Sequence, residues 1–167
     1  MLTTEYVMNP DTYYSKMNKV FETIELFGFE VIVLEHPTSN HLSSKFNNRK
    51  SVRSDTCSFV YNSNFVISHQ STAISYAILC FKPIVLISTI EMSLCLDNPI
   101  PLMHSYSKLL GIPLYSAENF NDNFILPSSQ VDEKLYSNFM YRYLVSKGSE
   151  YKLNINIVLN FLENHFG

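Results

Sequence analysis

The stretch that decides the fold is NFVISHQSTAISYAILCFKPIVLIS, residues 64–88. It begins with an apolar run at 65–67, passes through polar residues at 68–72, and then carries apolar residues at helical spacing over 71–81. A second apolar run at 84–87 follows Lys82 and Pro83. This pattern predicts a buried strand, a polar turn, a helix and another buried strand. The order is typical of an α/β unit with parallel strands.

The flanking sequence extends the alternation of helices and strands. Asn9 and Pro10 provide a helix start and Gly28 a helix end, so we expect a helix over 10–27 and a strand over 29–34. Between residues 38 and 61 we expect a loop at 38–51, with room for one helical turn, and a short helix at 55–61. After the deciding stretch we expect a loop at 91–101, a helix at 102–110, a strand at 112–115 and an irregular segment at 116–130. Two helices should follow at 131–145 and 154–166, and the start of the second also fits a strand.

These elements predict an α/β fold: a Rossmann-like three-layer α/β/α arrangement with a mostly parallel sheet. The strands are apolar throughout rather than alternating, which indicates a sheet covered on both faces. The 167 residues fit a single domain over 1–167, with C-terminal helices from about residue 130.

Composition narrows the class of function. Hydrophobic residues make up 46% and charged residues 16%, which favours a folded globular protein. The net charge of −3 argues against a general nucleic-acid binder. A local basic cluster (Lys45, Arg49, Lys50 and Arg53) is either a solvated loop or a loop that attracts a phosphate or an acidic acceptor.

The cysteines and the hydropathy pattern bear on location. There are three cysteines, without metal-ligand spacing, which favours a reducing compartment. We find no signal-peptide pattern and no apolar run long enough to span a membrane, so we expect a cytoplasmic protein.

Polar residues follow three of the apolar runs: Glu-His-Pro at 35–37, Ser-His-Gln-Ser-Thr at 68–72, and Ser-Thr at 88–89. Ligands of open parallel sheets bind outside the carboxyl ends of the strands. We therefore expect these three corners to converge on one binding site.

The corner at 68–72 has the character of a phosphate site. Ser71 and Thr72 stand at the expected helix start, where either can cap the helix and where free backbone N–H groups favour an anion. Ser68 and Gln70 are accessory candidates. His69 is either a second donor or a buried spacer.

At the first corner, Pro37 forces an extended backbone at His36 and holds its ring at the strand exit. His36 either donates a hydrogen bond to a phosphate or is bonded locally in the loop. Glu35 either orients His36 or is solvated. Glu91, after the third corner, either receives a ribose hydroxyl or is solvated.

The sequence carries none of the HExxH, CxxC, Walker or GxGxxG motifs, so we expect no metal and no dinucleotide cofactor.

Two motifs carry a family resemblance: VIVLEHP at 31–37 and FVISHQSTAISYAILCFKPIVLI at 65–87. With a long helix before the first of them, the chain resembles the C-terminal, donor-binding half of GT-B-fold glycosyltransferases that build bacterial surface carbohydrate. The likeness is to the sialyltransferase and Kdo-transferase type, and it covers residues 11 to about 115.

The resemblance implies that His36, Ser71 and Thr72 hold the donor phosphate and that His36 stabilises the leaving group without a metal. The donor is then a nucleotide-sugar, with a CMP-sugar favoured and a UDP-sugar as the other choice, for capsule or lipopolysaccharide synthesis. The family's acceptor-binding N-terminal domain has no room in this chain. We therefore expect no transfer by this chain alone, and a full enzyme at the inner face of the membrane as a peripheral protein.

Two alternatives remain beside this interpretation. A sugar-nucleotide epimerase of similar architecture would need several acid–base groups, for which Glu35 and Glu91 are the candidates. A non-catalytic α/β interaction module would use the Tyr- and Phe-rich helices as its contact surface.

Overall fold

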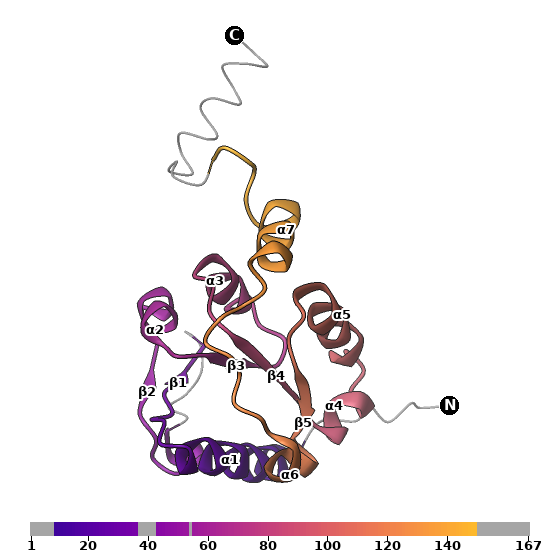
Figure 1. Ribbon diagram of the computed structural model, residues 1–167. Coiled ribbons are helices and arrows are strands. Elements are labelled where there is room, and N and C mark those ends of the chain that lie inside the picture. Colours follow the sequence, from indigo (N-terminus) through magenta and orange to yellow (C-terminus); the bar gives the residue numbers. More distant parts are fainter. Residues whose placement is uncertain (1–8, 37–42, 54, 150–167) are drawn as a thin grey trace, which may run out of the picture.

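Parallel strands form two small sheets in the computed structural model, which describes residues 9–36, 43–53 and 55–149 (Figure 1). In one sheet, β1 (Val33–Leu34) pairs with β2 (Ser51–Val52). In the other, β4 (Ile84–Ser88) lies between β3 (Val66–Ser68) and β5 (Leu114–Ser116). Every strand pair is parallel, as the buried apolar runs predicted.

Helices cover both faces of these strands. One hydrophobic cluster joins the strands to α2 (Thr56–Asn62), α3 (Ile74–Leu79), α5 (Ile100–Leu110) and α7 (Glu133–Tyr143). The other joins them to α1 (Pro10–Leu26), η1 (Ser43–Phe46), η2 (Ala117–Asn119) and α6 (Phe120–Asn123). A further helix, α4 (Ile90–Leu94), follows β4. The predicted three-layer α/β/α fold is confirmed.

Alternating side chains show that the two sheets continue one another. Leu34 of β1 and Val66 of β3 pack against the α2, α3, α5 and α7 side, whereas Val33 and Ile67 pack against the α1 side. It is β1, not β2, that faces β3, which makes the spatial order β2-β1-β3-β4-β5. In doubly wound sheets of this order, the direction of winding reverses between β1 and β3.

The first helix forms as its sequence predicts. Asn9 accepts hydrogen bonds from the backbone N–H groups of Asp11 and Thr12 at 2.9 and 3.3 Å, Pro10 occupies the first turn, and Gly28 follows the helix end at φ 86°. The helices expected near 55–61, 102–110 and 131–145 are also confirmed as α2, α5 and α7.

Several expected boundaries were wrong. β1 has two residues instead of the run at 29–34, and β2 lies in a segment that was expected to be a loop. The expected loop at 91–101 contains most of α4 and the start of α5, and the irregular segment at 116–130 contains η2 and α6. α3 ends at Leu79, because Phe81 takes a left-handed φ of 51° and the N–H of Lys82 donates to the carbonyl of Ala77 at 2.8 Å. The helix expected at 154–166 lies outside the described residues.

Candidate functional site

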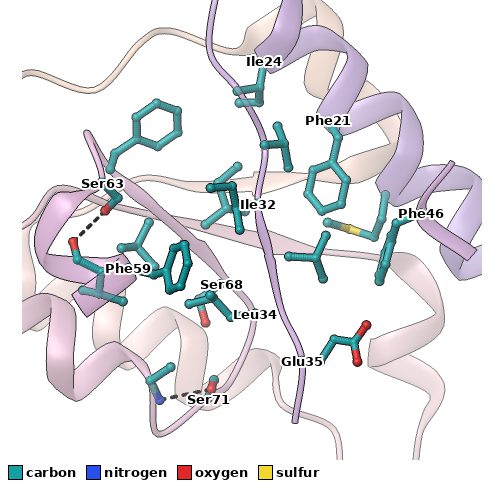
Figure 2. A pocket seen from close by; sticks show the side chains of 18 of the residues that line it. Phe21, Ile24, Ile32, Leu34, Glu35, Phe46, Phe59, Ser63, Ser68 and Ser71 are labelled. Carbon is teal, nitrogen blue, oxygen red and sulfur yellow. Dashed lines mark hydrogen bonds between the residues drawn. The ribbon is translucent and has the colours of Figure 1, made fainter. Parts of the chain in front are cut away.

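A groove of about 650 Å³ lies between β1 and β3 (Figure 2). Its volume falls within the usual range for small-molecule sites, about 300–1,000 Å³. α1 forms one wall, residues 29–36 another, and residues 59–71 the third. The wall side chains are mainly apolar; among them are Met17, Phe21, Ile24, Ile32, Phe46, Phe59 and Val60.

The groove exists because the facing edges of β1 and β3 are not paired. The N–H groups of Val33 and Glu35 donate to the β2 segment at 2.9 and 2.8 Å, and that of Val66 donates to Pro83 on the β4 side at 2.8 Å. Among the described residues, no backbone hydrogen bond joins β1 to β3. The rings of Phe29 and Phe65, which precede these strands, meet edge to face at 5.3 Å. This ring contact bridges the segments before the two strands, and both rings belong to the groove lining.

Two of the three polar corners line this groove. Glu35 and His36 do so at the end of β1, and residues 68–71 do so at the end of β3. Figure 2 shows Leu34 beside Ser68, with the carboxylate of Glu35 on the other side of its strand. The groove therefore opens where the chain topology of such sheets places ligands.

The third corner does not join them, which corrects the expected convergence. Ser88 donates to the carbonyl of Tyr115 at 3.2 Å. Thr89 is buried and caps α4, accepting from the N–H of Met92 at 3.4 Å. Internal bonds engage both side chains, and neither lines the groove.

The helix start at Ser71 and Thr72 differs from expectation. α3 begins only at Ile74, because a tighter turn intervenes: the N–H of Ile74 donates to the carbonyl of Ser71 at 3.1 Å. The hydroxyl of Ser71 accepts from the N–H of Ala73 at 3.1 Å. Both predicted residues are exposed, Ser71 on the groove and Thr72 beside its lining. Their hydroxyls keep donor capacity, but neither caps the helix.

His69 is a half-buried structural residue, which favours the alternative of a spacer over that of a second phosphate donor. Its Nδ1 bonds to the carbonyl oxygen of Ile87, which can only accept, so Nδ1 carries the proton. Its Nε2 therefore accepts from the hydroxyl of Tyr13, 2.9 Å away. Burial lowers the pKa of His69, and burial together with the neighbouring Tyr14 raises the pKa of Tyr13 to about 12. Both groups remain neutral and link β3 to α1.

Glu35 is buried instead of solvated. Its side chain is 2% exposed, and its Oε2 accepts from Nε of Arg53 at 3.0 Å. Arg53 follows β2 directly, so this ion pair joins the carboxyl ends of two adjacent strands. His36, the next residue, is exposed at the groove.

Glu91 is also not a solvated loop residue. It lies in the first turn of α4 with a side chain 12% exposed, and its Oε1 pairs with Nζ of Lys16 at 2.5 Å. The same ammonium binds Glu118 at 2.7 Å. The bond to Lys16 lowers the pKa of Glu91 against the opposing effect of burial. Glu91 lies outside the groove lining.

Sequence reasoning missed Tyr13 and Lys16, which lie three positions apart on α1 and bind residues that follow β3, β4 and β5. Two polar residues on the otherwise apolar face of a helix indicate that both have partners within the fold, but the sequence does not reveal which residues those partners are.

In the basic cluster, Arg49 has a structural role: its Nε and Nη2 bind both carboxylate oxygens of Glu25 at 2.7 and 2.8 Å.

Comparison with known proteins found no matching family model, no similar curated protein and no similar solved structure. Within residues 9–36, 43–53 and 55–149, no cluster of acidic, histidine and cysteine side chains is suited to hold a metal ion. In the same residues, no helix combines the length and apolar character needed to cross a membrane.

Proposed function

We propose that this chain binds a nucleotide-sugar in the groove between β1 and β3 and serves as the donor-binding part of a glycosyltransferase for capsule or lipopolysaccharide synthesis. The observation that carries the proposal is the groove itself. It lies at the point of a doubly wound sheet where ligands bind, and its rim contains His36 and Ser71. Both belong to the motifs that resemble the glycosyltransferase family.

In this proposal the apolar walls cover the flat parts of the nucleotide, and the polar rim holds its phosphate. His36 donates a hydrogen bond to a phosphate oxygen, and the hydroxyls of Ser71 and Thr72 donate further ones. As the bond between the sugar carbon and the phosphate oxygen breaks, negative charge grows on that phosphate. Donors already in place stabilise this charge, and they do so without a metal.

The other half of the reaction needs groups from a second domain. The acceptor hydroxyl forms the new bond to the sugar carbon, and a base must take its proton. We assign no residue of this chain to that role. A CMP-sugar is the favoured donor and a UDP-sugar the alternative.

The epimerase alternative receives less support. It needs several acid–base groups that face the ligand. Glu91 lies outside the groove lining, and Glu35, although it lines the groove, is 2% exposed and paired with Arg53.

The test is calorimetric titration of the chain with CMP, CDP and UDP. We expect saturable binding that weakens about tenfold or more in His36→Ala, because a hydrogen bond to a charged group contributes about 1.5–3 kcal/mol. His104→Ala is the matched control, since His104 is exposed on α5 and does not line the groove. Absence of saturable binding, or equal affinities for both variants, would contradict the proposal.

A further inference from the structure

Glu35, a residue of the VIVLEHP motif at the groove, forms an ion pair with Arg53, which lies outside both family-like motifs. Leu34 of β1 is in register with Val52 of β2, so the next residues, Glu35 and Arg53, leave the same edge of the sheet on the same face. Their side chains meet with Nε of Arg53 3.0 Å from Oε2 of Glu35. Glu35 lines the polar end of the groove, and Arg53 lies beside that lining as its ion-pair partner.

The two partners are buried to very different extents. The carboxylate of Glu35 is 2% exposed, whereas the side chain of Arg53 is 38% exposed. Burial of a carboxylate is costly unless a cation compensates it. Here the cation itself stays accessible, so Glu35 can fix the direction of the guanidinium while the guanidinium still meets solvent.

The other cations of the basic cluster are less suited to a ligand in the groove. Arg49 is 9% exposed and has a two-bond pair with Glu25. Lys50 precedes β2, so it stands at the amino end of that strand, whereas the polar rim follows the carboxyl ends. Lys45 lies 3.5 Å from Asp11 and above the ring of Tyr14.

The chemistry of a guanidinium suits a phosphate. It is planar, stays charged at every relevant pH, and carries five N–H donors in a fork that matches two phosphate oxygens. The bond to Glu35 is made through Nε of this fork. A phosphate that approaches the end of β1 would then meet a charged fork as well as the ring of His36.

We propose that Arg53, oriented by Glu35, binds the phosphate of the ligand in the β1–β3 groove. This inference rests on the proposed function for the identity of the ligand, and it adds the cation that neutralises the phosphate. Arg53 is a binding residue, and Glu35 is a positioning residue that acts through it.

The experiment compares three probes by titration: CMP, cytidine and inorganic pyrophosphate. In Arg53→Gln we expect CMP and pyrophosphate to bind at least tenfold more weakly, with cytidine within about twofold of the wild-type affinity. For Arg53→Lys, the affinities for CMP and pyrophosphate should lie between those of the wild type and Arg53→Gln, because lysine retains the charge but not the forked guanidinium. The matched control is Arg142→Gln, which removes an exposed arginine of α7 and should leave all three affinities unchanged.

Glu35→Gln separates positioning from simple attraction. It retains the Arg53 charge but weakens its anchor, so CMP affinity should fall about threefold to tenfold while cytidine affinity stays constant. Circular dichroism of each variant reports whether it is folded. If a glutamine variant does not fold, Arg53→Lys and the salt dependence of CMP binding by the wild type still test the inference.

The outcomes distinguish this inference from the proposed function. An unchanged ratio of CMP to cytidine affinity in both Arg53 variants would overturn the role of Arg53 and leave the nucleotide site standing. Binding of pyrophosphate through Arg53 without any binding of CMP, CDP or UDP would support the phosphate site and refute the nucleotide-sugar. Failure of every probe to bind the wild type would overturn both.

Discussion

Replacing Glu118 by glutamine should destabilise the protein and change how its stability depends on pH. The carboxylate of Glu118 is held by three donors. Its Oε1 accepts from Nζ of Lys16 at 2.7 Å and from the N–H of Ile90 at 2.9 Å, and its Oε2 accepts from the hydroxyl of Ser116. Glu118 thus ties α1 to the start of α4 and the end of β5.

These contacts set the magnitude. Burial opposes ionisation and raises the pKa of Glu118, but the bonds from Ile90, Lys16 and Ser116 outweigh it and lower the pKa to about 2, from a reference value of 4.5. Each pKa unit corresponds to about 1.4 kcal/mol of differential stabilisation. Because the side chain is 23% exposed and solvent weakens the effect, we expect a contribution of about 1–2 kcal/mol.

The direction of the pH dependence follows from the lowered pKa. The ionised carboxylate stabilises the fold fully above about pH 4.5, and this contribution disappears as the pH falls toward 2, where the folded protein also binds the proton. In the wild type, therefore, the free energy of unfolding should fall in this window. In Glu118→Gln it should be about 1–2 kcal/mol lower at pH 7 and should decline less as the pH falls.

The assay is urea unfolding followed by circular dichroism at pH 7, 4.5 and 3. Glu133→Gln is the control, because Glu133 is an exposed carboxylate in the first turn of α7. The reasoning would be refuted if the Glu118 variant matched this control at pH 7, or if its stability fell between pH 4.5 and 3 as steeply as that of the wild type.

Two further substitutions test other parts of the fold, both by urea unfolding. Tyr13→Phe removes the donor to Nε2 of half-buried His69 and should lower the free energy of unfolding by about 1–3 kcal/mol. The control is Tyr14→Phe, whose ring packs edge to face on η1 and which should cost less; equal losses would contradict the assigned bond. Gly111→Ala places a Cβ 3.0 Å from a leucine side chain of α7 at a φ of 65°, whereas Gly28→Ala introduces a similar left-handed strain at a φ of 86° into open space. We expect Gly111→Ala to cost about 1 kcal/mol more than Gly28→Ala, and a smaller loss for Gly111→Ala would show that α7 does not pack there as described.

Local sequence determined the elements whose signals lie close together in the chain. The cap at Asn9 and the glycine at Gly28 define α1 without any tertiary contact. The apolar runs around residues 65–67 and 84–87 are too uniformly hydrophobic for an exposed sheet, so the parallel strands β3 and β4 follow from composition alone. Of the two, β4 is buried as expected, whereas β3 is half-buried because it borders the groove. The polar corners after the strands were also visible in the sequence, because strand and turn residues differ in type.

The tertiary structure decided which of those corners form one site. β2 has two residues and therefore no periodicity to recognise, yet its pairing with β1 brings Arg53 against Glu35. His69 and Tyr13 are 56 positions apart, and their hydrogen bond gives a structural role to a histidine that the sequence left open as a phosphate donor. A local pattern specifies whether a residue is in a strand or a turn. The packing of helices and strands decides which distant side chain neutralises or covers that residue. For that reason only the folded chain shows which polar residues form the rim of the β1–β3 groove and which ones hold the structure around it.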